Sequence, residues 1–213
     1  MKMTFKALVI LLSIVSATNA CKFEDEDRIE KVLAVTGQNF YNQKDELCEN
    51  LEEHSKKLYN KMAVEEVLAI HAYTENSWYR KINGVLRSPG RYSAADKALY
   101  KPLANILKEG LLKMPKYSGK VIRWADWGER TIKRLKVGKN KLMKAFTSSS
   151  KNLAFTWGSK NVKMIIKSKT GRYIGFLSQY EHEQEVLFPP YKKFKVTKKA
   201  EDGHVTVFDM TEQ

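Results

Sequence analysis

Cysteine is scarce in this chain of 213 residues, which has only two, Cys21 and Cys48. They form no zinc-type spacing with the histidines. The chain also lacks a P-loop and the glycine-rich fingerprint of dinucleotide-binding folds. We therefore expect no metal site, and these two nucleotide-binding motifs are excluded.

Long hydrophobic runs are absent too, since a bilayer-spanning helix takes roughly 20 apolar residues. A short apolar run, residues 7–15, follows a basic start, and small and polar residues follow it. This is the pattern of an export signal. We expect residues 1–20 to be a signal peptide cleaved after Ala17 or Ala20, with a retained anchor as the alternative. The mature protein is then secreted or extracytoplasmic, without a stable membrane span.

Cys21 could be modified in one of two ways in the mature protein, by a lipid anchor or by a disulfide. Cleavage after Ala20 would leave Cys21 first, where a lipid anchor could be attached, although Thr18 stands where lipoprotein signals carry an aliphatic residue. In an oxidising compartment an even pair most simply forms one disulfide. We expect the Cys21 to Cys48 disulfide, with the lipid anchor as the alternative.

Charge is one-sided, with 38 Lys and Arg, 24 Asp and Glu, and a net charge of +14. Much of the excess lies in residues 133–144 and 192–199. Such a surface steers a protein toward acidic partners, nucleic acid, anionic membrane or a dianionic dinucleotide, or is simply a solvated face. No nucleic-acid-binding motif accompanies the charge, so we expect no nucleic-acid partner.

The first half of the chain has the pattern of helices. Ser93 followed by Asp96 predicts a helix cap, and Pro102 is expected at a helix start or a break. Pro115 and Gly119 then end the helical half. Apolar residues recur at helical spacing in three segments: 24–35, 62–73 and 103–111.

From Lys120 the hydrophobic period changes to two, which predicts short strands. Turn signals stand at residues 138–140, 170–171 and 189–190. Helices followed by strands predict an α+β fold in one domain, residues 21–213, with a helical part over about 24–115 and a β core over about 119–210. The expected strands are 121–124, 145–148, 162–167, 185–188, 194–196 and 205–208.

Three short elements in the strand half carry the candidate chemistry. Arg123 lies in an apolar strand, where an arginine most often points to solvent or pairs with a carboxylate. Residues 146–150 end a strand in three serines, which alone are typical of a loop or cap. Glu183 and Glu185 stand two apart at a strand start, so we expect them to point the same way. Two exposed glutamates on a sheet edge are the plainer interpretation.

Arginine, then Ser-x-Ser, then Glu-x-Glu on successive strands resembles the arginine-specific mono-ADP-ribosyltransferases, which include cholera-type toxins and vertebrate ecto-enzymes. Residues 73–87 are similar to the family's helical segment with its Tyr-Thr, Ile-Asn and Leu-Arg pairs. Residues 169–178 and 185–196 extend the likeness through the strand half. The resemblance implies helices packed on a two-sheet β core, with NAD as substrate and arginine of a target protein as acceptor.

The resemblance also implies roles for individual residues. Arg123 would contact a phosphate of NAD. Glu185 would hydrogen-bond the nicotinamide ribose and stabilise an oxocarbenium-like charge. Ser148 would hold Glu185 in place, and Glu183 would position the target guanidinium and help to deprotonate it. A glutamate at 183, where other members carry glutamine, accompanies arginine as acceptor.

Several neighbours would complete the site. Trp124 and Ser149 would also contact NAD, although many members carry glycine and threonine at these two positions. Residues 180–182 would face the protein substrate or be plain surface loop. Phe155 and Trp157 would flank the nicotinamide or fill core, and core is the preferred interpretation.

We expect a monomer that catalyses arginine ADP-ribosylation. The alternatives are an NAD glycohydrolase that uses the same residues and a silent binding module of the same fold.

Overall fold

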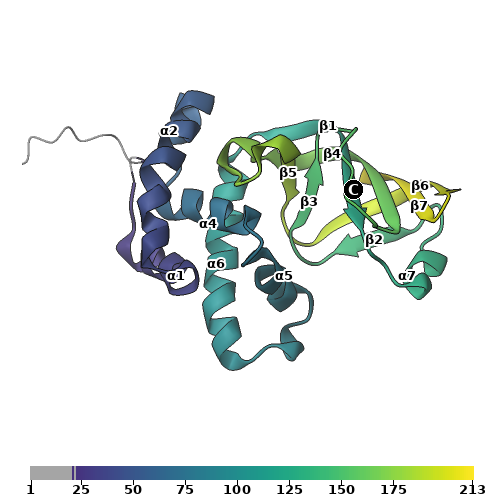
Figure 1. Ribbon diagram of the computed structural model, residues 1–213, viewed down its shortest axis with the longest axis horizontal. Coiled ribbons are helices and arrows are strands. Elements are labelled where there is room, and N and C mark those ends of the chain that lie inside the picture. Colours follow the sequence, from purple (N-terminus) through teal and green to yellow (C-terminus); the bar gives the residue numbers. More distant parts are fainter. Residues whose placement is uncertain (1–20, 22) are drawn as a thin grey trace, which may run out of the picture.

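The computed structural model describes residues 21 and 23–213 (Figure 1). The expected signal peptide therefore lies outside the described residues. Helices fill the first half and strands the second, which confirms the α+β prediction. The helical half contains α1 (Glu26–Thr36), α2 (Lys44–His54), α3 (Lys56–Tyr59), α4 (Val64–Thr74), α5 (Tyr79–Arg87), α6 (Ala94–Lys113) and the 3₁₀ turns η1 (Gln38–Gln43) and η2 (Pro89–Arg91).

Helix α4 is the centre of the helical half and is buried along nearly its whole length between α1, α2 and α6. A Cβ at Gly110 of α6 would lie 2.7 Å from Glu66 Cβ, so the glycine permits the close α4 to α6 approach. The buried Glu66 accepts from Lys113 Nζ at 2.7 Å and from the Ala63 backbone N–H at 3.0 Å. These bonds satisfy a carboxylate that burial would otherwise penalise.

Helix α6 runs straight through Pro102, so the expectation that this proline marks a helix start or break is wrong. A proline in a helix interior costs about 3 kcal/mol. Burying Leu103, Ile106 and Leu107, each worth roughly 1.5 to 3 kcal/mol, outweighs that cost. The predicted cap at the start of this helix is confirmed, because the Asp96 N–H donates to Ser93 Oγ at 2.9 Å.

Cys21 and Cys48 form a disulfide that joins the N-terminal segment to α2, and both are buried. This confirms the predicted pairing. The Cys21 sulfur is committed to Cys48 and is therefore not available for a lipid.

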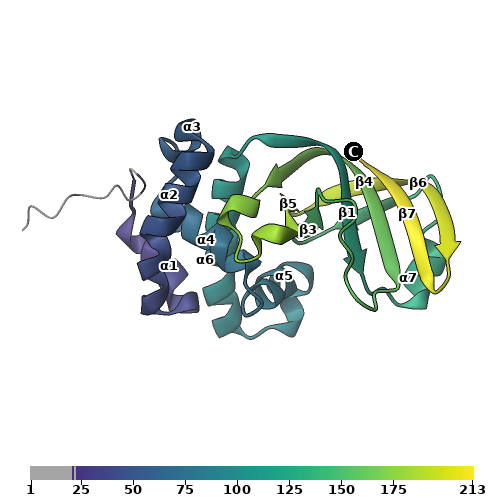
Figure 2. The same ribbon diagram turned by 45° about the horizontal axis from the view of Figure 1, so that its top comes forward.

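The strand half contains seven strands, ordered β1-β3-β5-β4-β7-β6-β2. Figure 2 shows β1, β4, β7 and β6 lying side by side. β1 pairs with β4 as well as with β3, and all seven strands are hydrogen-bonded into one continuous sheet. Phe188, Phe194 and Phe208 fill its core. The elements are β1 (Lys116–Ala125), α7 (Glu129–Arg134), β2 (Asn140–Met143), β3 (Thr147–Ser150), β4 (Val162–Tyr173), η3 (Gly175–Leu177), η4 (Glu181–Glu183), β5 (Glu185–Phe188), β6 (Lys192–Asp202) and β7 (Val205–Glu212).

One turn prediction is wrong. Thr170 and Gly171 lie within β4, where a Cβ at Gly171 would meet Val186 Cγ1 at 2.7 Å. This glycine serves close strand packing and not a turn. The predicted turn at residues 138–140 is confirmed at Gly138, which has φ 83° and lies in a turn just before β2. The edge strand β2, which begins at Asn140 and pairs with β6, was not predicted from the sequence.

The described residues form two apolar cores, and the strand half contributes to both. Phe146, Leu177 and Leu187 from the strand half belong to the same apolar cluster as α4 and α6. In the described residues no helix is both long and apolar enough to cross a membrane.

Candidate active site

Glu185 opens β5 and is buried, with 4% of its surface exposed. Burial raises the pKa of this carboxyl to about 7, and the charge of Glu183 adds to the rise. A hydrogen bond with Ser148 and the charge of Arg123 lower the same pKa. A carboxyl so placed changes protonation near neutral pH, which is typical of functional sites.

Arg123 reaches from β1 toward β3, where its Nη1 donates to the Ser148 carbonyl oxygen at 2.5 Å. Its buried Nε has no hydrogen-bond partner in the described part of the chain. Burial lowers the pKa of the guanidinium, which nevertheless stays protonated at neutral pH. Arg123 is thus bound to β3 and still has N–H groups that can donate to an anion.

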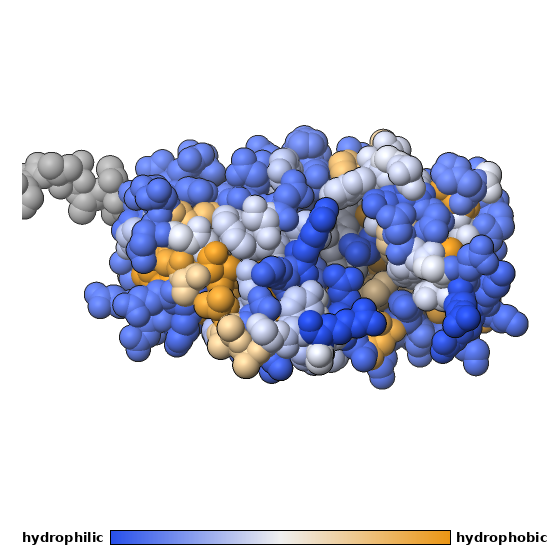
Figure 3. Space-filling view, turned by 60° about the horizontal axis from the view of Figure 1, so that its bottom comes forward, coloured by the Kyte–Doolittle hydropathy of each residue, from blue (hydrophilic) through white to orange (hydrophobic). Residues whose placement is uncertain are grey.

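A cleft of about 300 Å³ opens beside Arg123. Figure 3 looks onto a hollowed face between the helical half, at the left, and the strand half. None of the lining residues is acidic, and Arg87, Arg123, Lys141 and Lys144 supply positive charge. Glu185 and Ser148 do not line the cleft themselves but are connected to it through Arg123. The lining residues are Asn83, Arg87, Arg123, Trp127 and residues 141–147.

Helix α5 contributes Asn83 and Arg87, to which the sequence analysis assigned no role. Asn83 Nδ2 donates to the Tyr73 hydroxyl at 2.9 Å, while its buried Oδ1 has no partner in the described residues. Arg87 Nε donates to the Asn83 carbonyl oxygen at 3.2 Å. The four-residue spacing of Asn83 and Arg87 within a helical segment places them on one face, and this signal could have identified them.

Glu183 ends the 3₁₀ turn η4, and Gln184 follows in the left-handed region with φ 48°. The two glutamates are therefore not related by strand alternation, and that reasoning was wrong. They are still close enough for the charge of Glu183 to raise the pKa of Glu185. Glu183 is half-buried, and this burial raises its own pKa.

The remaining predicted contacts lie on β1 and β3. The Ser149 hydroxyl donates to the Val186 carbonyl oxygen at 2.7 Å and is buried, so it ties β3 to β5. Trp124 Nε1 donates to the Phe155 carbonyl oxygen at 2.9 Å, which anchors the loop that follows β3. Trp124 and Ser149 thus position the strands and loop around Arg123.

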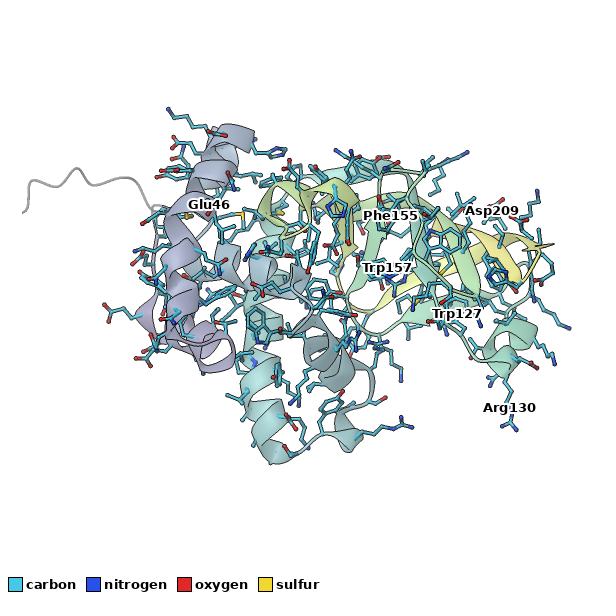
Figure 4. All side chains as sticks on the ribbon, in the orientation of Figure 1. Glu46, Trp127, Arg130, Phe155, Trp157 and Asp209 are labelled. Atoms are coloured by element: carbon cyan, nitrogen blue, oxygen red, sulfur yellow. A yellow bond between two sulfur atoms is a disulfide. The ribbon has the colours of Figure 1, made fainter. Side chains whose placement is uncertain are left out.

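Phe155 and Trp157 lie over the strand half, as does Trp127 (Figure 4). Trp157 is 46% exposed and Phe155 is half-buried, so the preference for core is wrong for both. They belong to the irregular segment between β3 and β4, which has no strand to carry side chains inward. Their rings meet edge to face, 5.9 Å apart. In the described residues no group of three or more His, Cys, Asp or Glu could hold a metal ion.

A family model for NAD:arginine ADP-ribosyltransferases matches residues 23–212. The chain belongs to this family. Arg123, Ser148 and Glu185, which the resemblance singled out, are the residues that the fold connects, and the helical segment of residues 73–87 supplies two more lining residues.

Sequence relatives agree with this assignment. The NAD(+)–protein-arginine ADP-ribosyltransferase Tre1 of Pseudomonas putida (strain GB-1) is 36% identical over 149 residues, 70% of this chain and 29% of the relative. The Tre1 of Serratia proteamaculans (strain 568) is 27% identical over 157 residues, 74% of this chain and 34% of that protein. The chain thus spans about a third of the length of these two relatives.

The type III effector XopAI of Xanthomonas axonopodis pv. citri has the same fold. It superposes with a TM-score of 0.74 at 21% identity, over 92% of this chain and 86% of that chain.

Proposed function

We propose that this protein cleaves NAD and transfers its ADP-ribose to the side chain of arginine on a target protein. One observation carries the proposal: the buried Glu185 is held by Ser148, and Arg123 is bound to the carbonyl of the same serine beside a cationic cleft. Family membership supports the same chemistry.

The cleft fits the dinucleotide. Its cations and its lack of acidic residues suit the two negative charges of the diphosphate. Asn83 Oδ1 and Arg123 Nε are buried polar atoms without partners in the described residues, and a bound polar ligand would satisfy them. We assign the diphosphate to Arg87 and Arg123.

In the reaction, the bond between the nicotinamide nitrogen and ribose C1′ breaks, and its electron pair leaves with nicotinamide. Positive charge then develops on the ribose, where the Glu185 carboxylate stabilises it. A guanidinium nitrogen of the acceptor bonds to C1′ and gives up a proton, which Glu183 accepts. Ser148 and Arg123 favour the ionised form of Glu185, because both lower its pKa against the larger effect of burial.

We place the protein outside the cytoplasm, without a nucleic-acid partner and as a monomer. The Cys21 to Cys48 disulfide supports this location, since such bonds persist in oxidising compartments. The mass of the exported protein tests it, and a mass that still includes residues 1–17 would contradict the expected cleavage.

The activity is tested by incubating the protein with labelled NAD and agmatine, a free guanidinium compound. We expect nicotinamide release together with labelled agmatine, and arginine as the modified residue when a protein lysate replaces agmatine. Nicotinamide release without any labelled guanidinium would identify a glycohydrolase. No release would identify a silent binding module.

A further inference from the structure

The ribbon formed by β2 and β6 has one buried face and one exposed face. Its register pairs Asn140 with Lys195 and Leu142 with Lys193, and all four side chains are exposed. Phe194 of β6 alternates with these lysines and is fully buried in the core. We call the exposed face the β2–β6 surface, and include in it Lys136, Val137 and Lys139 before β2, Lys144 after β2 and Tyr191 before β6.

The cations of this surface are largely uncompensated. Residues 133–144 and 191–199 contain no Asp or Glu. Nearby, Lys133 pairs with Glu129 and Lys192 with Glu212. Five exposed lysines of the β2–β6 surface form no ion pair in the described residues: Lys136, Lys139, Lys144, Lys193 and Lys195. So many unpaired like charges favour a negatively charged partner.

Apolar side chains stand between these lysines. Val137 is 59% exposed, Leu142 40% and Tyr191 63%. Leu142 pairs with Lys193, and Tyr191 lies two residues before this lysine, immediately before β6. Tyr191 has φ 64°, in the left-handed region that aromatic residues adopt rarely, and strained residues gather at functional positions. The turn thus holds an aromatic ring out in solvent at the edge of the lysine cluster.

We infer that the β2–β6 surface docks on a phospholipid membrane with anionic headgroups. Lysines attract such headgroups, while Leu, Val and Tyr side chains enter the boundary between headgroups and acyl chains. A nucleic acid would match the lysines but would give Val137 and Leu142 no apolar partner. An acidic protein would have to match charges spread along the whole ribbon in register, whereas a fluid lipid surface imposes no register.

The distribution of charge over the molecule supports this orientation. Helices α1 and α2 lie at the opposite end from β6 and α7 (Figures 1 and 2). Glu46 extends from α2 at that far end, and Arg130 points outward from α7 (Figure 4). An anionic surface would therefore attract the strand end and repel the end with α1 and α2. Acidic residues of that end include Glu24, Asp25, Glu26, Asp27, Glu30, Asp45, Glu46, Glu49, Glu52 and Glu53.

Docking in this way would bring the cleft to the membrane, because residues 141–144 line the cleft and belong to the same edge strand or follow it directly. Acceptor proteins at a membrane surface would then be presented to the enzyme. Leu142 and Lys144 belong to both the surface and the cleft, whereas Val137, Tyr191, Lys193 and Lys195 do not line the cleft. Substituting these last four residues therefore tests the docking separately from the proposed function.

The test is sedimentation with vesicles of phosphatidylcholine alone and of phosphatidylcholine mixed with phosphatidylglycerol. The chain from Cys21 to Gln213 is used, since it contains both cores and the disulfide and removes the apolar residues 7–15 as a source of binding. We compare Lys193→Glu/Lys195→Glu with the matched control Lys101→Glu/Lys108→Glu, which changes net charge equally on the exposed side of α6. None of these four lysines lines the cleft.

We expect binding to the mixed vesicles only, and weaker binding as salt rises. Loss of one lysine near an anionic surface lowers partitioning about fivefold, so the Lys193→Glu/Lys195→Glu variant should lose about 25-fold or more. The control should lose less than about threefold, because its charges lie away from the docking face. Val137→Ser/Tyr191→Asn should also weaken binding, and asparagine keeps the left-handed backbone accessible.

Equal binding to both vesicle types, or equal losses in the two lysine variants, would overturn the inference. The Lys193→Glu/Lys195→Glu variant could also keep its vesicle binding and lose binding to polyglutamate or single-stranded RNA. That result would assign the surface to that polymer and would also overturn the inference. Labelling of agmatine is measured in parallel and should be unaffected in every variant. Absence of labelling in the parent chain would count against the proposed function and leave the docking result standing.

Discussion

Arg123 binds Ser148 through the backbone and not through the hydroxyl: Nη1 donates to the Ser148 carbonyl oxygen at 2.5 Å. The hydroxyl is thereby left to hydrogen-bond Glu185. One arginine thus fixes the strand that carries the serine, and the serine in turn holds the glutamate. Predicted effects of substitutions follow from this chain of contacts.

Arg123→Lys should keep the charge but lose the planar fork that spans Ser148 and the cleft. We expect kcat/KM for NAD cleavage to fall by about 100-fold or more, with circular dichroism unchanged. An unchanged kcat/KM would show that charge alone is needed at this position.

The pH dependence of NAD cleavage should report Glu185. Its pKa is raised to about 7, and catalysis needs the carboxylate, so kcat/KM should rise with pH through about 7 and level off above it. Below the midpoint the slope should approach tenfold per pH unit. A profile flat from pH 5 to 8 would contradict this assignment.

Ser148→Ala should move that midpoint to higher pH, because the hydrogen bond with Ser148 lowers the pKa of Glu185. Ser149→Ala is the comparison, since the Ser149 hydroxyl bonds the Val186 carbonyl and not Glu185. Its midpoint should stay in place. Equal shifts in both variants would indicate a general change of the sheet.

Glu185 should also make folding stability depend on pH. Between the ordinary glutamate pKa of about 4.5 and the folded value of about 7, the native state holds the proton and the unfolded state does not. Stability therefore falls as pH rises through this window and stays low above it. Glu185→Gln should remove the fall and stabilise the protein at pH 8 by up to about 3 kcal/mol relative to pH 5. Urea unfolding at the two pH values measures how the substitution changes the free energy of unfolding. Equal changes at pH 5 and pH 8 would contradict the raised pKa of the buried Glu185 carboxyl.

The disulfide should stabilise the helical half. Cys21 and Cys48 are 27 residues apart, and closing such a loop is worth about 3.5 kcal/mol. Cys21→Ala/Cys48→Ala should lower the free energy of unfolding by this order, while reductant should have no effect on the variant. If reductant lowers the free energy of unfolding equally in the parent and in the variant, the disulfide is not the source of this stability.

Local patterns predicted much of this fold. Ile29, Val32 and Leu33 stand at helical spacing and are the buried face of α1, and Ser93 caps α6 as expected. Pro102 was mispredicted because tertiary burial outweighs a local helix penalty. The edge strand β2 was missed because its four residues have too little pattern of their own and depend on β6.

The sequence also predicted which three residues the candidate site brings together. Arg123, Ser148 and Glu185 could be chosen from the order of their motifs, because strands bring such elements together. The position of Glu183 could not, since the left-handed Gln184 between the glutamates is a conformation set by tertiary packing. Asn83 and Arg87 lie within the matching segment of residues 73–87, but their place in the cleft is visible only in the structure.

Glu185 should serve every reaction of NAD, while Glu183 should serve only the arginine acceptor. Nicotinamide release and agmatine labelling are measured side by side for Glu185→Gln and Glu183→Gln, after circular dichroism confirms that both are folded. Glu185→Gln should lower both activities by about 100-fold or more, because the lost charge is needed to break the glycosidic bond. Glu183→Gln should lose agmatine labelling and keep most nicotinamide release, because water needs no guanidinium to be positioned. Equal losses in Glu183→Gln would remove its role as acceptor base, and undiminished NAD cleavage by folded Glu185→Gln would contradict the mechanism.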